Sequence, residues 1–170
     1  TSGNLDNNNG FGAGIVNSGS LGSTSISVTD AHGVWRINPG DVVLVHQTQG
    51  TGAGCWELNK AVSDFGGGTA TYQLAQPLQC NFVTGGSNRA QIIRIPQYST
   101  CNITGTVYPL AAWNGSWGGI FAVLCNNPLT IASGGRIDAN AAGFRGGQAG
   151  NDDNSTQGEG YPGLGTYRTE

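Results

Sequence analysis

The sequence predicts an all-β protein, and three observations lead to this fold class. Apolar and polar residues alternate over short stretches, which is the two-residue side-chain period of a strand. Glycine, proline and asparagine interrupt these stretches at short intervals, as turns between strands do. A helical apolar period is hinted at only over residues 58–62, a segment too short for a stable helix. We therefore expect many short strands.

Residues 23–97 are expected to form a small barrel or sandwich, because they hold the longer strands and hairpin-sized connections. Thr24, Ile26 and Val28 share one face of the first of these strands. The sequence Asn38-Pro39-Gly40 predicts a turn between the next two strands. The strands predicted after the first cover residues 33–37, 41–46, 55–62, 69–74 and 90–95.

The N-terminal residues 1–22 are predicted to be a polar arm, rich in asparagine, glycine and serine. Within this arm, residues 11–16 form an apolar island that suits one strand pairing with a distant segment.

Residues 98–147 are expected to continue as a β-solenoid-like, glycine-rich segment. Short strands are each followed by a glycine or asparagine corner, which suits a chain that winds in stacked coils, although no strict repeat is present. Ile137 and Phe144 supply apolar anchors for its glycine-rich end. Residues 148–170 are predicted to be a glycine-rich loop or tail, and the whole chain one compact unit. The strands predicted here cover residues 105–110, 119–125, 129–132 and 136–139.

The composition excludes several classes of partner. Of the 170 residues only 10% are charged, and the formal net charge is -3. With seven basic residues scattered along the chain, no basic patch is expected, so nucleic acid is excluded as a partner. No apolar run approaches the roughly 20 residues of a membrane span, so we expect no membrane-spanning segment.

The four cysteines predict two disulfide bonds, since they lack CxxC spacing and a neighbouring histidine cluster that would indicate zinc. Three pairings exist. The pairing of Cys55 with Cys80 and of Cys101 with Cys125 is favoured, because each joins segments expected to be near neighbours. Disulfides indicate an extracellular or cell-surface location, whereas the alternative is four buried free thiols in a reducing cell.

Six segments form a distinctive ordered set along the chain: GDVVLVHQTQG (40–50), GAGCWEL (52–58), AQIIRIPQYS (90–99), AAWNGSWGGIFAV (111–123), RIDANAAGFRGG (136–147) and GEGY (158–161). Together they resemble large, glycine-rich bacterial surface or secreted proteins of the agglutinin and adhesin type. The resemblance covers roughly residues 39–161 and implies an extracellular, β-rich structural or adhesive role, without a catalytic mechanism. Such proteins usually continue through more glycine-rich sequence, whereas this chain stops at Glu170, which suggests a fragment, a cleavage product or a compact relative.

The best candidate for surface recognition is the segment from Trp113 to Trp117. Exposed indoles stack on sugar rings, and a side chain such as Asn114 can bond hydroxyl groups, so this segment predicts a glycan-binding site. The alternative is that both tryptophans are buried at the end of the barrel or solenoid. Trp35 and Trp56 alternate with apolar neighbours and are expected in the core.

Calcium is the one cofactor that the residues suggest. Asp152, Asp153 and Glu159, with Asn154 between them, gather oxygen ligands in one loop. Their spacing matches neither an EF-hand nor the calcium-binding β-roll repeat, so a solvated loop is the alternative.

Three N-glycosylation sequons begin at Asn102, Asn114 and Asn154, and each predicts a surface turn if the host glycosylates asparagine. In a chain rich in asparagine and threonine, accidental sequons are the alternative.

Catalysis is not expected. Asp30, His32 and His46 have no serine or cysteine nucleophile placed near them in sequence. The carboxylates available for glycoside chemistry lie far apart in sequence, at Asp41, Glu57, Asp64 and Asp138.

The sequence thus predicts a non-catalytic, extracellular structural or adhesive protein that associates with itself or with cell-surface or matrix components. The alternatives are a filament subunit that exchanges strands through its N-terminal arm, a glycan-binding module, and a polysaccharide-degrading enzyme.

Overall fold

The computed structural model describes residues 13–31, 37–64 and 68–146, and within them every regular element is a strand. The predicted all-β class is confirmed. The described residues contain no helix long and apolar enough to cross a membrane. The strands are β1 (Ala13–Gly19), β2 (Ser25–Asp30), β3 (Val42–Gln49), β4 (Trp56–Lys60), β5 (Thr69–Gln73), β6 (Phe82–Val83), β7 (Arg89–Arg94), β8 (Gln97–Tyr98), β9 (Asn102–Ile103), β10 (Thr106–Val107), β11 (Leu124–Cys125), β12 (Thr130–Ile131) and β13 (Arg136–Ile137).

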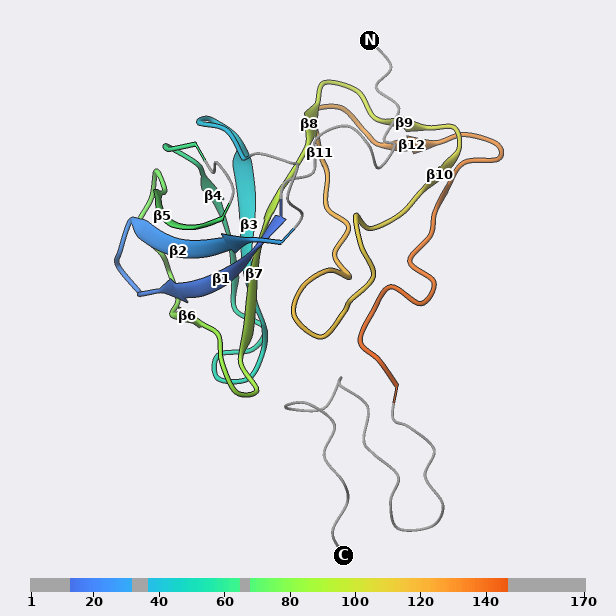
Figure 1. Cartoon of the computed structure of the whole chain (residues 1–170). Helices are drawn as coiled ribbons and strands as arrows, with labels where there is room; N and C mark the ends of the chain where they lie inside the picture. Colours follow the sequence, from blue (N-terminus) through green and yellow to red (C-terminus); the bar gives the residue numbers. More distant parts are fainter. Residues whose placement is uncertain (1–12, 32–36, 65–67, 147–170) are drawn as a thin grey trace, which may run out of the picture.

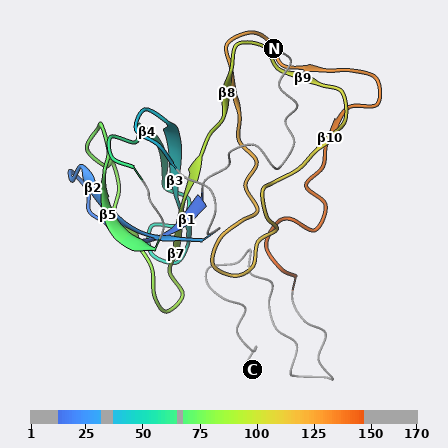
Figure 2. The ribbon, with the colours of Figure 1, turned by 45° about the horizontal axis from the view of Figure 1, so that its top comes forward.

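The longer strands form one mainly antiparallel sheet of seven strands. Its order is β4-β3-β7-β1-β2-β5, and β6 also pairs with β1. The sheet curls strongly, so that β4 and β5 approach each other in Figures 1 and 2. Just beyond these two strands, Ala61 and Leu74 form an antiparallel bridge, and the Val62 amide donates to the Gln73 carbonyl oxygen at 2.9 Å. The two strands that end the sheet path are thereby connected.

Strand β1 lies between β7 and β2 in this sheet. Ala13 pairs with Ile93 of β7, and Val16 pairs with Val28 of β2. Residues 13–19 of the predicted N-terminal arm are therefore part of the sheet, and the apolar island does contribute to a strand that pairs far along the chain.

The core lies on the concave side of this sheet. Ile26 and Val28 are buried there, as the alternation of β2 predicted, and Val43 and Val45 of β3 lie in the same cluster. The turn after Asn38 is also confirmed, since the Asp41 amide donates to the Asn38 carbonyl oxygen at 3.0 Å. Of the strand predicted over residues 33–37, only Ile37 belongs to the described residues, and it is buried.

Both favoured disulfides are present. Cys55 is bonded to Cys80 with their Cα atoms 6.6 Å apart, and Cys101 is bonded to Cys125 with a Cα separation of 5.9 Å. The first ties the start of β4 to the segment before β6 within the sheet. The second connects Cys101, directly before β9, with Cys125 of β11.

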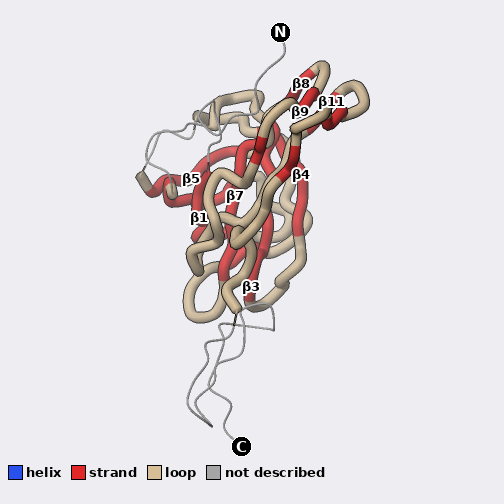
Figure 3. Tube along the Cα trace, turned by 90° about the vertical axis from the view of Figure 1, so that its right-hand side faces the viewer, coloured by secondary structure: helices blue, strands red, loops and turns tan. Residues whose placement is uncertain are grey.

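The shorter strands form three parallel pairs, which run in the same order along two rows. The first row is β8, β9 and β10, the second row is β11, β12 and β13, and the pairs are β8 with β11, β9 with β12, and β10 with β13. The offset between partners (124 minus 97, 130 minus 102, 136 minus 106) grows from 27 to 30 residues. The two rows lie side by side in Figures 1 and 2. Figure 3 shows that their strands are short and are joined by longer stretches of loop and turn.

Two side chains of β7 connect the sheet to the segment between the rows. Gln91 Oε1 accepts from the Gly118 amide at 2.9 Å, and Arg89 Nε donates to the Gly115 carbonyl oxygen at 2.6 Å. The loop that carries Trp113 and Trp117 is therefore bound directly to the sheet.

Candidate functional site

Strand β4 turns two polar residues, Glu57 and Asn59, toward the core and two apolar residues, Trp56 and Leu58, outward. Trp56 is 61% exposed and Leu58 is 47% exposed, whereas Glu57 and Asn59 between them are buried. The prediction that Trp56 lies in the core was wrong. The reason is the register of β4, because a one-residue shift sends every side chain of a strand to the other face.

Hydrogen bonds to the segment after β5 explain why polar residues occupy the inner face of β4. Glu57 Oε2 accepts from the Gln79 amide at 2.6 Å, and Glu57 Oε1 accepts from Asn59 Nδ2 at 3.1 Å. Asn59 Nδ2 also donates to the Gln76 carbonyl oxygen, and Asn59 Oδ1 accepts from the Gln76 amide. These backbone groups satisfy the buried polar side chains of Glu57 and Asn59, which would otherwise be costly to bury.

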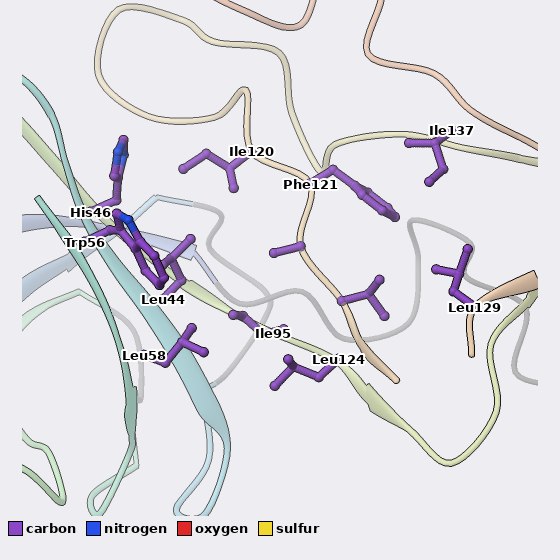
Figure 4. A pocket seen from close by; sticks show the side chains of 12 residues that line it. Leu44, His46, Trp56, Leu58, Ile95, Ile120, Phe121, Leu124, Leu129 and Ile137 are labelled. Atoms are coloured by element: carbon purple, nitrogen blue, oxygen red, sulfur yellow. The ribbon is translucent and has the colours of Figure 1, made fainter. Parts of the chain in front are cut away.

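The outer face of β3 and β4 forms one wall of an apolar groove of about 570 Å³. Leu44 pairs with Leu58 across the two strands, and His46 pairs with Trp56. Figure 4 shows Phe121, Leu129 and Ile137 lying opposite this wall. The complete lining consists of Leu44, His46, Trp56, Leu58, Ile95, Ile120, Phe121, Ala122, Val123, Leu124, Leu129 and Ile137.

His46 is the one titratable side chain among these lining residues. Its Nδ1 lies 3.0 Å from Thr48 Oγ1 within the same strand. Burial lowers the pKa of His46 below its ordinary value of 6.5, because desolvation disfavours the charged imidazolium. The lowered pKa keeps the His46 imidazole neutral near pH 7.

The segment predicted to bind glycans is folded against the sheet. Trp113 is buried, and its ring meets the Phe144 ring edge to face, with centroids 5.3 Å apart. Asn114 Oδ1 accepts from the amides of Ser116 and Trp117, so its carbonyl group closes a turn. Trp117 is partly buried. The structure thus brings these residues together in one turn, with little of Trp113 open to a ligand.

A smaller cavity of about 280 Å³ carries more polar groups. Its lining includes Tyr108, which is exposed, together with Asp138 and Asn140. Asp138 Oδ1 accepts from the Asn140 amide at 3.0 Å, and Asp138 Oδ2 lies 3.6 Å from Arg136 Nη2. These are groups that can bond hydroxyls.

The predicted calcium ligands Asp152, Asp153 and Glu159 lie outside the described residues, as does Asn154 of the third sequon. Within the described part of the chain, no group of three or more His, Cys, Asp or Glu side chains is placed to hold a metal ion. Asn102 and Asn114 of the other sequons are both exposed.

Three of the four carboxylates considered for catalysis, Asp41, Glu57 and Asp138, bond to different partners. Asp41 Oδ2 forms an ion pair with Arg94 Nε at 2.8 Å, and Glu57 is buried beneath β4. Asp138 lies by Arg136 on the second row. His32 lies outside the described residues.

The groove was not predicted from the sequence. A sequence signal for the groove does exist in residues 56–60, where apolar and polar residues alternate. From the sequence alone, either the apolar set or the polar set of this strand could face the core. Comparison with known proteins finds no matching family model, curated sequence or solved structure.

Proposed function

We propose that this protein is a non-catalytic, extracellular structural or adhesive β protein of a cell surface or matrix. The apolar groove is the observation that carries the proposal, because it exposes Trp56 and Leu58 opposite the apolar residues of the second row. Large exposed apolar surfaces rimmed by polar residues are typical of contact sites between macromolecules. Enzymatic sites instead gather several convergent polar groups.

The two disulfides and the low charge support the extracellular part of the proposal. Disulfides persist in oxidising compartments, and both described bonds connect segments more than 20 residues apart. The resemblance to adhesin-like surface proteins points the same way.

The architecture that fits this role is a small barrel followed by two coils of a solenoid. The bridge between Ala61 and Leu74 supports closure of the sheet into a barrel. The three parallel pairs, in one order and with similar offsets, support stacked coils.

Adsorption to defined surfaces tests the contact role of the groove. The purified chain is expected to adsorb more to an alkyl-terminated monolayer than to a hydroxyl-terminated one, and Trp56→Ser should reduce this difference severalfold. Leu21→Ser is the matched control, because Leu21 is also 61% exposed but does not line the groove. Equal losses in both variants, or equal adsorption to the two surfaces, would contradict the contact role.

The extracellular location has a separate test. Protein taken from its native source and alkylated before unfolding should show no modified cysteine by mass spectrometry. Alkylation of all four cysteines would place the protein in a reducing compartment and overturn this part of the proposal.

Glycan binding is the second candidate, and the cavity beside Tyr108 favours it. The Tyr108 ring offers a stacking surface, and Asp138 and Asn140 offer polar groups for hydroxyls. A glycan array should then give a signal that Tyr108→Ala removes and Tyr98→Ala leaves, since Tyr98 does not line this cavity. An array without signal argues against this candidate.

The strand-exchange filament and the polysaccharide-degrading enzyme have no observation that favours them. Strand β1 already has ladder partners on both sides in its own sheet. Asp41, Glu57 and Asp138 bond to separate partners.

A further inference from the structure

We propose that a second copy of this chain pairs, strand to strand, with the open edge of the second row. The open edge is the side of β11, β12 and β13 that faces away from the first row. This inference rests on the proposed structural role and names a second copy of the chain as the binding partner.

Within the described residues, backbone groups on the open edge have no ladder partner. The amides of Thr130 and Ala132 donate to the first row, at Cys101 and Ile103, and those of Arg136 and Asp138 do the same at Gly105 and Val107. Neighbouring residues of a strand direct their backbone groups to opposite sides, so Ile131 and Ile137 direct theirs to the open edge. Each of the three pairs is a two-stranded sheet within the described residues, so no third strand covers this edge there.

The exposed fractions of paired side chains show that the second row lacks the covering that the first row has. Ile131 pairs with Ile103, and Ile137 pairs with Val107. The first-row partners Ile103 and Val107 are 2% and 5% exposed, whereas Ile131 and Ile137 are 50% and 43% exposed. The same ladder position is therefore buried in the first row and half open to solvent in the second. The terminal coils of stacked β structures need another element to cover their open edge.

The open edge is complementary to a second copy of itself. Arg136 and Asp138 carry opposite charges on either side of Ile137. If two β13 strands pair antiparallel about a two-fold axis at Ile137, Arg136 of one copy lies opposite the partner's Asp138. Opposite charges directly across a strand pair are stabilising, and the two Ile137 side chains cover each other. A two-fold arrangement of this kind is closed and yields a dimer.

Light scattering tests the association directly. The wild-type chain is expected to approach twice the monomer mass of 17.4 kDa as its concentration rises. Ile137→Lys should return it to the monomer mass, whereas Leu21→Lys, an equally non-conservative change at an exposed leucine in a turn, should not. A wild-type chain that stays monomeric, or that grows beyond the dimer into open polymers, would overturn the proposal.

A cysteine at the proposed axis gives a positive test that does not depend on weakening the protein. Ile137→Cys should form a disulfide between copies under mild oxidation, because residues directly opposite on paired strands have Cα atoms about 4.5–5.5 Å apart. Leu21→Cys is the matched control. Equal cross-linking of the two variants would contradict the axis. The alkylation test does not depend on Ile137, so failure of the dimer and failure of the proposed extracellular location can be distinguished.

Discussion

Ile103 and Ile131 occupy partnered positions in one parallel ladder, yet Ile103 is 2% exposed and Ile131 is 50% exposed. Tyr98, Phe121 and Val123 pack around Ile103 in a small cluster separate from the core of the sheet. Burial of an isoleucine side chain contributes about 1.5–3 kcal/mol, so the second row leaves a substantial part of that stabilisation unrealised. The proposed pairing of two copies rests on the same kind of difference one strand further along, between Val107 and its partner Ile137, because it would bury Ile137.

The buried polar pair beneath β4 is predicted to be essential for stability. Glu57→Leu leaves the Gln79 amide without its acceptor and should lower the free energy of unfolding by about 1–3 kcal/mol. Lys60→Leu, an outward-facing change on the same strand, should change it by no more than about 0.5 kcal/mol. Chemical denaturation measures both, and a similar effect of the two changes would contradict the observed register.

Two glycines with positive φ are predicted to respond differently to alanine. Gly119 and Gly134 have φ angles of 73° and 82°, so alanine is strained at either position, by about 1–2 kcal/mol. At Gly119 an added Cβ would also lie 2.7 Å from the Ala142 carbonyl oxygen, whereas nothing lies within 4 Å at Gly134. Gly119→Ala should therefore lower the melting temperature more than Gly134→Ala. The reverse order would argue against the close approach of residues 119 and 142.

The disulfide between Cys101 and Cys125 is predicted to hold the second row against the first. Replacing both cysteines by alanine should lower the free energy of unfolding by about 3 kcal/mol, as expected for a bond that closes a loop of this length. Hydrogen exchange should rise at the Asn126 amide, which donates to the Tyr98 carbonyl oxygen. Unchanged exchange there would show that the rows pair without the bond.

His46 is predicted to make stability depend on pH. Its pKa in the folded protein lies below 6.5 because burial disfavours the charged form, so the unfolded chain binds a proton first as the pH falls. The free energy of unfolding should therefore decrease as the pH falls from about 7 to about 5. His46→Gln should flatten the curve in this window, and a variant with the wild-type slope would contradict the assignment.

Much of the sheet could be predicted from local patterns. The alternation of Ile26 and Val28, and the turn after Asn38, each depend on neighbours in sequence, and both agree with the structure. The favoured pairing of the cysteines also agrees. Strands of the second half proved shorter than predicted, with two residues each from β8 to β13, because loops and turns make up most of this segment.

The groove could not be predicted, because its decisive residue pairs are distant in sequence. Which face of β4 turns inward is decided by the bonds from Glu57 to Gln79 and from Asn59 to Gln76. Trp113 was a candidate for surface recognition, and its burial depends on Phe144, some 30 residues away. Such contacts leave no periodic signal in the sequence.

Amide hydrogen exchange along β12 and β13, measured over a range of protein concentrations, is the decisive measurement for the open edge. The amides of Ala132 and Asp138 donate to the first row and should be protected at every concentration. The amide of Ile137, at the proposed two-fold axis, should exchange rapidly in dilute protein and become protected as the concentration rises. If the exchange rate of the Ile137 amide is the same at all concentrations, the open edge is not a surface on which this protein assembles.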